Sequence, residues 1–384
     1  MSAAEPADRF ARAAIFGYAT RSRRSAVIMR MIDLLNPTAK DGGPCELKGH
    51  CIISSVAGVG DLFIHLPLIE GIIAKVRDNG GEATVALRPA HAEIGRAIGW
   101  KVIYFENPLQ DIFGGTINWR VLRTVLKDFR EMRCRKPDLW IDLTGNAFNA
   151  FHLRMLGIRN LAARVTRGGR SLVRHRLPNE RFENEYENRK RLAEHLGCCL
   201  DTSVFKRLAL RLTQGYVLLG VSTNCLWRNW PIARFLELAR RFPKRYFVLA
   251  GLTREIDPES AADLAELLRL PNVENRMDQF TLMQLVEAVS GAAAVVTNDT
   301  SIAHIANALG VPGAVLFGPG ISEQWALDGG LRIFHDRSCP LYPCVAWRCG
   351  RPEEWCMEKI AVDPVAEHLR AILTVPSHLG MESI

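Results

Sequence analysis

The chain has 384 residues, of which 48% are hydrophobic and 23% charged, and its formal net charge is +8. This length predicts two domains, each with its own core, and the composition is that of a folded protein. No apolar run approaches the roughly 20 residues that span a bilayer, and the N-terminus lacks the continuous apolar segment of a secretion signal. We therefore predict a protein without a transmembrane helix that is located in the cytoplasm. Thiols are normally reduced in that compartment.

Residues 1–50 are predicted to be an appendage. A basic segment, 21–24, precedes a short stretch at 26–35 that is apolar on one side and ends before Asn36-Pro37. A basic amphipathic helix of this kind either lies on an anionic membrane surface or packs on its own protein or a partner subunit. The sequence leaves these alternatives open.

A first α/β series begins with a predicted strand at 51–55. It runs into a turn with Gly58 and Gly60, and Asp61 stands at the start of the next helix. Glycines let the backbone pass close to a ligand, and Asp61 either points into a cleft above the sheet or caps the helix. Further strands are expected at 83–87, 101–105 and 139–143, and their alternation with helices predicts a parallel, doubly wound sheet.

An arginine-rich stretch follows this series, with no acidic residue inside it. It suits a phosphorylated or carboxylated partner or an anionic membrane face, although a solvated surface is an equally simple interpretation. Aromatic residues do not interleave with the arginines and no RNA-binding or zinc-finger signature occurs, so nucleic acid is not expected as a partner. The arginines are Arg154, Arg159, Arg164, Arg167, Arg170, Arg174 and Arg176.

A second α/β series starts after a linker at 212–215. A strand at 216–221, a long loop at 222–231, a helix at 232–242 and a strand at 246–250 are expected in turn. Each half of the chain is therefore predicted to be a Rossmann-like sheet with polar loops at the carboxyl ends of its strands.

The most informative segment lies near residue 300. An apolar run at 291–296 predicts a buried strand, and the polar residues 298–301 then open an amphipathic helix that ends at Gly310. A strand at 314–317 follows. Free backbone N–H groups and the helix dipole meet at such a helix start, which predicts a binding site for a diphosphate.

Several of these motifs together resemble a known protein family. Gly60-Asp61, Trp230-Pro231 and Asn298-Asp299-Thr300 with His304 are similar to glycosyltransferase family 9, the ADP-heptose-dependent heptosyltransferases of lipopolysaccharide core assembly. The 137–146 segment, the Phe317-Gly318-Pro319 turn and a C-terminal cysteine cluster also fit the family. The resemblance runs from about residue 51 to 373.

The resemblance implies the GT-B fold, with two facing Rossmann-like, doubly wound parallel-sheet domains. The acceptor would bind mainly to the N-terminal domain, 51–212, and the nucleotide-sugar donor to the C-terminal domain, 213–360. The remaining 361–384 would form a tail and a helix, 365–373, that crosses back onto the N-terminal domain.

The resemblance also implies a role for each matching residue. Asp61 would be the general base of a single inverting displacement, and Arg228, where the family commonly has Lys, would stabilise the departing diphosphate. Simpler interpretations are that Asp61 is a helix cap, that Arg228 is a surface charge beside Trp227 and Trp230, and that His304 is a core histidine. Four residues would bind the phosphate groups of the donor: Thr223, Asn224, Thr300 and Ser301. Glu255 would bind the ribose hydroxyls. Asp299 and His304 would face the sugar of the donor.

The sequence differs from the usual family pattern at two positions that would contact the donor. Ser301 stands where the family usually has Gly, so its side chain narrows the approach to the phosphates, and Arg228 is not equivalent to Lys. Both changes concern the identity of the donor more than the class of reaction.

No cofactor is expected for catalysis. The chain contains no Asp-x-Asp, the common way of presenting a divalent ion to a nucleotide diphosphate, so a metal-independent reaction is predicted. Four of the ten cysteines lie within eighteen residues and are interpreted as a structural metal site, as reduced thiols or as a disulfide. They are Cys339, Cys344, Cys349 and Cys356.

The predicted function is transfer of heptose from ADP-heptose to the lipopolysaccharide inner core, at the cytoplasmic face of the inner membrane. Arg154, Arg159 and Arg164 would meet anionic groups of the acceptor. Two alternatives remain: the same transfer to serine residues of an autotransporter protein, and non-catalytic binding of a nucleotide sugar or glycan on the same fold.

Overall fold

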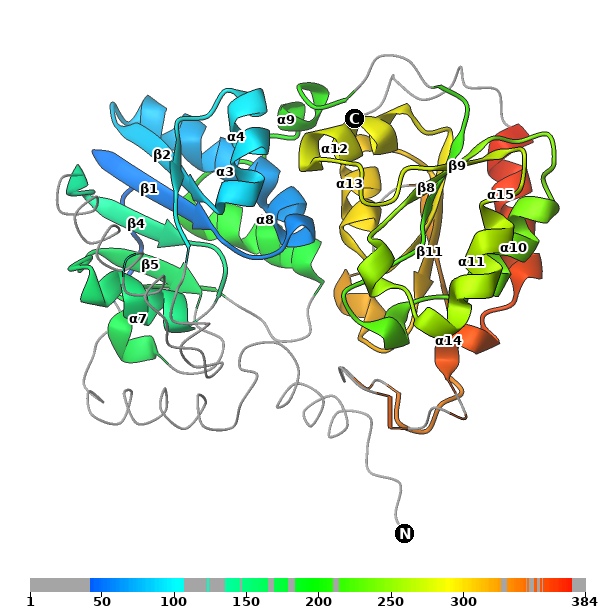
Figure 1. The fold of residues 1–384 in the computed structure, drawn as a ribbon. Helices are drawn as coiled ribbons and strands as arrows, with labels where there is room; N and C mark the ends of the chain where they lie inside the picture. Colours follow the sequence, from blue (N-terminus) through cyan, green and yellow to red (C-terminus); the bar gives the residue numbers. More distant parts are fainter. Residues whose placement is uncertain are drawn as a thin grey trace, which may run out of the picture. The chain divides into compact units, whose positions relative to one another are not determined.

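The structure is a computed structural model, which describes residues 42–106, 123, 135–145, 147–164, 169–178, 184–209, 214–325, 330–342, 344, 349–350, 353 and 355–374. The described chain forms two compact units that divide between Arg207 and Leu208 (Figure 1). The predicted amphipathic segment at 26–35 and half of the predicted linker, residues 212 and 213, lie outside the described residues.

The N-terminal unit is built on a six-stranded sheet in the order β3-β2-β1-β4-β5-β6, and every strand pair is parallel. The order reverses direction between β1 and β4, which makes this pair the switch point of the sheet. The strands are β1 (His50–Ser55), β2 (Glu82–Leu87), β3 (Val102–Tyr104), β4 (Leu139–Asp142), β5 (Leu161–Arg164) and β6 (His175–Leu177). The helices are α3 (Val59–Asp78), η1 (Pro89–His91), α4 (Ala92–Ile98), α7 (Ala147–Met155), η2 (Arg170–Leu172), α8 (Glu185–Leu196) and α9 (Ser203–Lys206).

The C-terminal unit repeats this plan with the order β12-β11-β10-β7-β8-β9, again all parallel, and its switch point lies between β7 and β10. The strands are β7 (Val217–Gly220), β8 (Phe247–Ala250), β9 (Val273–Asn275), β10 (Ala294–Asn298), β11 (Gly313–Phe317) and β12 (Leu331–His335). The helices are η3 (Leu226–Arg228), α10 (Ile232–Arg240), η4 (Thr253–Glu255), η5 (Pro258–Ser260), α11 (Ala261–Leu267), α12 (Leu282–Gly291), α13 (Ser301–Leu309), η6 (Ser322–Trp325), α14 (Cys356–Lys359) and α15 (Val362–Thr374).

Each sheet is buried on both faces, as expected for parallel strands covered by helices. All residues of β4, β5, β7, β8, β10 and β11 are buried. Large aromatic side chains fill the cores: Trp140 stacks at a tilt on Phe105, 5.1 Å between ring centres, and Trp230 meets Phe235 edge-on at 5.0 Å. The apolar runs of the sequence are therefore the interior strands.

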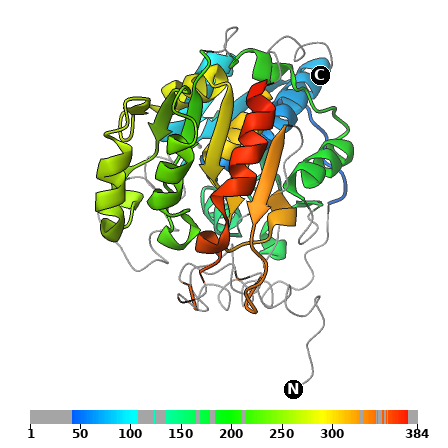
Figure 2. The same ribbon diagram turned by 90° about the vertical axis from the view of Figure 1, so that its right-hand side faces the viewer.

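The last helix packs in its own unit. Val365, Ala366 and Leu369 of α15 belong to the core formed with β7, β8 and β10, and α15 contacts β10, β11 and α10. Figure 2 shows α15 lying along the C-terminal sheet. The apolar stripe of α15 is used by the C-terminal core, and the expected packing of this helix on the N-terminal domain stays a prediction.

The predicted strands are found, with one notable shift. The run at 291–296 was expected to be strand throughout, but α12 continues to Gly291 and β10 begins only at Ala294. The capping box of Thr281 and Gln284 starts α12 firmly, so its last turn reaches into the small residues that precede the strand. Within the described residues, no helix is both long and apolar enough to cross a membrane.

Candidate active site

The polar loops of the C-terminal unit meet at its switch point. Strands β7 and β10 are neighbours in parallel register, from Val217 beside Ala294 to Gly220 beside Thr297. The chain leaves β7 toward η3 and α10, and it leaves β10 toward α13. Because both carboxyl ends lie at one edge of the sheet, the loops that follow them form the place where open α/β sheets bind ligands.

Helix α13 begins at this edge as the sequence predicted. Thr300 is its N-cap in an extended conformation, and the Thr300 hydroxyl accepts a hydrogen bond from the Ile302 amide at 3.3 Å. The hydroxyls of Thr297 and Thr300 are 3.2 Å apart. Ser301 is the first helical residue, and the helix ends at Gly310 with φ of +69°. The first-turn amides therefore face the carboxyl edge, where an anion is stabilised.

Arg228 and Asp299 form an ion pair across the switch point. The Arg228 guanidinium donates to the Asp299 carboxylate, and both side chains are mostly buried, 19% and 9% exposed. The simple interpretation of Arg228 as a surface charge is thus wrong. The pair fixes a cation beside the α13 N-terminus, where a leaving diphosphate would need it.

His304 lies one turn into α13 and is buried. Burial lowers its pKa, Arg228 lowers it further, and Asp299 opposes both effects. Its ring meets Trp325 edge-on, 5.7 Å between ring centres. His304 is therefore a neutral imidazole at neutral pH, placed next to the ion pair.

Asn298 connects the two loops, a role that sequence reasoning missed. Its side-chain oxygen accepts from the Trp230 amide at 2.8 Å, and its side-chain nitrogen donates to the Gly220 carbonyl at 3.3 Å. These bonds attach the segment after Arg228 to the ends of β7 and β10. The only signal in the sequence was the position of Asn298 between a strand and Asp299.

The remaining donor candidates surround this centre with different exposures. The Ser222 hydroxyl donates to Glu255 at 3.1 Å and accepts from the Leu252 amide at 2.8 Å, so it joins the loops after β7 and β8. Thr223 is buried and its hydroxyl donates to the Cys225 carbonyl at 2.7 Å, whereas Asn224 is exposed. The loop thus buries the polar side chains of Ser222 and Thr223 and exposes that of Asn224.

In the N-terminal unit, Asp61 lies at the corresponding edge. It is in the first turn of α3, directly after β1, and its Oδ2 atom accepts from the Gly58 amide at 2.9 Å. A methyl group at Gly58 would sit 3.1 Å from that oxygen, so the glycine gives the carboxylate room. Burial raises the pKa of Asp61, and Glu185 raises it further, while the Gly58 amide and Arg164 oppose the rise. Asp61 is thus a helix cap with the raised basicity that suits a general base.

A second acid, Asp142, ends β4 next to β1 and was not assigned a role from the sequence. It is fully buried, and its Oδ1 atom accepts from the Ser54 hydroxyl at 3.0 Å and from the Thr144 amide at 3.3 Å. Among the described residues, no donor reaches its Oδ2 atom. Burial raises the pKa of Asp142, which places a second perturbed carboxyl at the switch point of this sheet.

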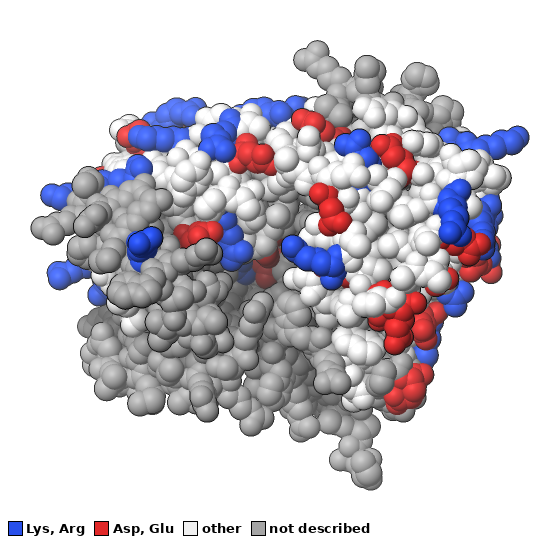
Figure 3. Space-filling model, in the orientation of Figure 1, with Lys and Arg blue, Asp and Glu red and all other residues white. Residues whose placement is uncertain are grey.

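The three arginines expected to meet the acceptor are not equivalent. Arg154 and Arg159 are exposed and adjacent, and the Arg154 guanidinium donates to the Arg159 carbonyl at 3.4 Å. Arg164 is instead 6% exposed and forms an ion pair with Glu185 at 3.0 Å. Arg164 is therefore buried, and its contact with an acceptor stays a prediction. Elsewhere on the described surface drawn in Figure 3, basic and acidic side chains are interspersed.

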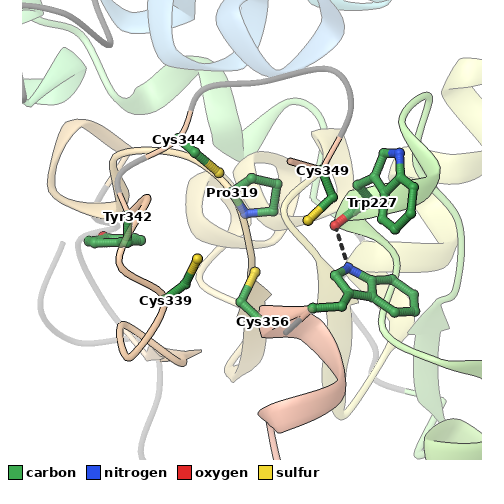
Figure 4. Close-up of a pocket in the computed structure, with 8 residues that line it drawn as sticks. Trp227, Pro319, Cys339, Tyr342, Cys344, Cys349 and Cys356 are labelled. Carbon is green, nitrogen blue, oxygen red and sulfur yellow. Dashed lines mark hydrogen bonds between the residues drawn. The ribbon is translucent and has the colours of Figure 1, made fainter. Parts of the chain in front are cut away.

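The four C-terminal cysteines line one pocket together with Trp227, Pro319, Tyr342 and Trp355. Figure 4 shows their sulfur atoms pointing into a shared space beside Pro319. All four are free thiols, and burial together with the other three cysteines raises the pKa of Cys356 to about 12. No group of three or more His, Cys, Asp or Glu side chains in the described part of the chain has the geometry of a metal site. The structural metal site, one of the three interpretations of these cysteines, therefore has no support in the described residues. The Trp355 indole donates to the Trp227 carbonyl at 2.9 Å, so the pocket braces the segment that carries Arg228.

A comparison with known families agrees with this geometry. Residues 174–329 match the model of glycosyltransferase family 9 (heptosyltransferase). The resemblance to this family is confirmed. The matched segment contains every donor candidate from Thr223 to His304, whereas Asp61 lies outside it.

Lipopolysaccharide heptosyltransferase 1 of Pseudomonas aeruginosa is 27% identical to this chain over 181 residues. That alignment covers 43% of this chain and 50% of the relative, so the chain spans about half the length of the curated relative it matches.

Solved structures confirm the fold class. The E. coli heptosyltransferase WaaC with ADP-2-deoxy-2-fluoro heptose has a TM-score of 0.65 at 14% identity, over 84% of this chain and 99% of that chain. E. coli ADP-heptose lps heptosyltransferase II has a TM-score of 0.62 at 18% identity, over 85% and 98%. The iron-containing dodecameric glycosyltransferase TibC from enterotoxigenic E. coli has a TM-score of 0.51 at 11% identity, over 85% and 77%. The chain has the GT-B fold of these proteins.

Proposed function

We propose that this protein is an inverting glycosyltransferase that moves heptose from ADP-heptose to an acceptor of the lipopolysaccharide inner core. The observation that carries the proposal is the Arg228–Asp299 pair at the N-terminus of α13, on the switch point of the C-terminal sheet. A fixed guanidinium and free helix amides are what a departing diphosphate requires.

The C-terminal unit would bind the donor. The Arg228 guanidinium is a planar fork of N–H donors that matches the oxygen atoms of a phosphate group, and Asp299 fixes its position. The backbone amides of Thr300 and Ser301, at the start of α13, would donate hydrogen bonds to the diphosphate. Glu255, anchored by Ser222, would receive the ribose hydroxyls. The ADP and ADP-heptose analogue held by WaaC structures support an adenine nucleotide as the donor's leaving group.

The N-terminal unit would supply the base. An acceptor hydroxyl loses its proton to Asp61 as its oxygen attacks the anomeric carbon; the bond from that carbon to the phosphate oxygen breaks, and ADP leaves with the electron pair. One carboxylate suffices for a single displacement, and the raised pKa of Asp61 improves it as a proton acceptor. Because the charge on ADP is met by Arg228 and α13, the step as proposed needs no metal ion.

The acceptor and the location are proposed on chemical grounds. Arg154 and Arg159 are exposed cations on the N-terminal unit and suit an anionic glycolipid core. We place the reaction at the cytoplasmic face of the inner membrane, because a nucleotide-sugar donor is made in the cytoplasm and a lipid-linked acceptor is held at the membrane.

The first test is thermal stabilisation by ADP, UDP, GDP and ADP-heptose. A ligand at about 100 times its dissociation constant adds roughly 2.7 kcal/mol, a clear rise in melting temperature. Selective stabilisation by ADP and ADP-heptose is expected. Stabilisation by UDP or GDP alone would refute the heptose donor, and no response to any nucleotide would favour a non-catalytic glycan-binding protein.

The second test fixes the acceptor. Purified protein with ADP-heptose is given heptose-free inner-core glycolipid or an unmodified autotransporter domain, and ADP release is measured. Release with the glycolipid alone supports the proposal. Release only with the protein would move the heptose to serine residues and refute the lipopolysaccharide acceptor.

A further inference from the structure

The N-terminal unit contains a buried ion pair next to α3 that has no direct role in the proposed transfer reaction. Arg164 ends β5, and its guanidinium pairs with the carboxylate of Glu185, the first residue of α8, at 3.0 Å. The side chains are 7% and 16% exposed. A pair this far from water keeps most of its electrostatic strength, unlike an ion pair on the surface.

Helix α8 holds this pair against the helix that carries Asp61. The Arg189 guanidinium, one turn after Glu185, donates to the Ile64 carbonyl of α3 at 3.0 Å. Arg189 also lies over the Tyr186 ring, 5.2 Å from its centre, and α3 and α8 pack side by side (Figure 1). The hydrogen bond from Arg189 to Ile64 joins the two helices about one turn after Glu185 and one turn after Asp61, so the start of α8 lies near the start of α3.

Four charged or titratable groups of the described chain act on this corner. Glu185 opposes ionisation of Asp61 and Arg164 favours it. Arg164 and Arg189, together with burial, lower the pKa of His65 to about 3, so His65 is neutral and contributes no charge. The His65 ring is 3.2 Å from the Ser55 hydroxyl at the end of β1. Burial and the Gly58 amide act most strongly on Asp61, and Glu185 and Arg164 are the neighbouring anion and cation that act on it in opposite directions.

We propose that Arg164 and Glu185 are positioning residues that set the basicity of Asp61: Glu185 opposes loss of its proton, and Arg164 holds Glu185 in place and limits that effect. The inference deepens the proposed function, because it rests on Asp61 being the base. It also gives a reason for a buried arginine at the end of β5. A purely structural ion pair would stabilise the fold without a directional effect on Asp61.

The test is a direct titration of the Asp61 carboxyl by ¹³C NMR in the full chain labelled at aspartate side-chain carbons. The signal of Asp61 is identified as the one missing from Asp61→Asn. Glu185→Gln removes the anion and is expected to move the midpoint to lower pH. Arg164→Met removes the cation that pairs with Glu185, and is expected to move the midpoint to higher pH. Each shift should be about one pH unit, the scale of one nearby charge.

Three controls separate this role from a structural one. Arg164→Lys keeps the charge and should restore a midpoint near that of the wild type. The double variant should lie between the two single variants. The exposed pair Glu187–Lys190, on the same helix with an N–O distance of 2.6 Å, provides the matched control. Glu187→Gln and Lys190→Gln should leave the midpoint unchanged.

The proposal is overturned if Glu185→Gln leaves the Asp61 midpoint unchanged, or if both single variants move it in the same direction. If Arg164→Met does not fold, Glu185→Gln and Arg164→Lys still decide. Failure of the proposed function is distinguishable: an active Asp61→Asn removes Asp61 as the base whatever the titration gives. An inactive Asp61→Asn with unmoved midpoints removes only the role of the ion pair.

Discussion

Removing the Arg228 guanidinium should impair both catalysis and stability, for separable reasons. In Arg228→Met the leaving diphosphate loses a charge-assisted hydrogen bond, worth about 1.5–3 kcal/mol. If that bond acts mainly on the departing group, kcat falls by roughly 10- to 150-fold. The substituted side chain also leaves Asp299, which is 9% exposed, without the partner that it has in the wild type.

The stability effect follows from that stranded carboxylate. Breaking a fully buried ion pair by removing one partner costs about 3–5 kcal/mol, and the partial exposure of Arg228 reduces this to roughly 1–3 kcal/mol. In a unit of this size each kcal/mol lowers the melting temperature by about 2–4 °C. Asp299→Asn in the same chain removes the stranded charge, so the double variant should regain the melting temperature but not the activity.

The assay combines ADP release from ADP-heptose with thermal melts of the same preparations. Arg240→Met is the matched control, because Arg240 pairs with Glu266 in the same unit but both side chains are about half exposed. That variant should change neither quantity. The reasoning is refuted if Arg228→Met keeps the wild-type kcat, or if the double variant recovers activity together with stability.

Four further outcomes are expected. Asp61→Asn should abolish transfer without lowering the melting temperature at pH 7: burial raises the pKa of Asp61 in the folded state, so its stabilising contribution is present at low pH and is lost as pH rises through that pKa. For the same reason, the acidic limb of the wild-type rate profile should lie above the usual range of an aspartate, and a limb at or below that range would contradict the base assignment. Asn298→Ala should cost about 1–3 kcal/mol in melts, since it leaves the buried Trp230 amide without its acceptor, and an unchanged melt would show that the two loops are held otherwise. Gly251→Ala should raise the KM for the donor, because φ is +149° and the added carbon would lie 2.6 Å from the Ser222 hydroxyl; an unchanged KM would remove that loop from the donor site.

Many of the strands and helices could be predicted from the pattern of apolar and polar residues along the sequence. Apolar runs bounded by glycine and polar residues located β1, β7, β8, β10 and β11, because strands buried on both faces need nearly continuous apolar sequence. The polar residues 298–301, which precede the apolar positions of the helix that begin at Ile302, predicted the start of α13. A helix needs a cap there because its first amides lack partners within the helix. Short strands at the sheet edges, such as β6 and β9, carried too little pattern to be predicted.

The site was predicted as a set of residues but not as a set of contacts. Asp61, Arg228 and Asp299 were named, yet nothing local indicated that Arg228 pairs with Asp299, 71 residues away. Asn298 received no role because its two partners come from another strand and another loop. The burial of Arg164 could not be predicted, because composition reports charge and not burial.

By itself the sequence determined two Rossmann-like series, the cap at α13 and the residue types of a diphosphate site, because these depend on neighbours along the chain. The strand order decided the rest: it put the ends of β7 and β10 side by side, buried Arg164 against Glu185, and gave the apolar stripe of α15 to the C-terminal core. Such pairings join segments far apart in the chain, and only the folded sheet determines which ends meet.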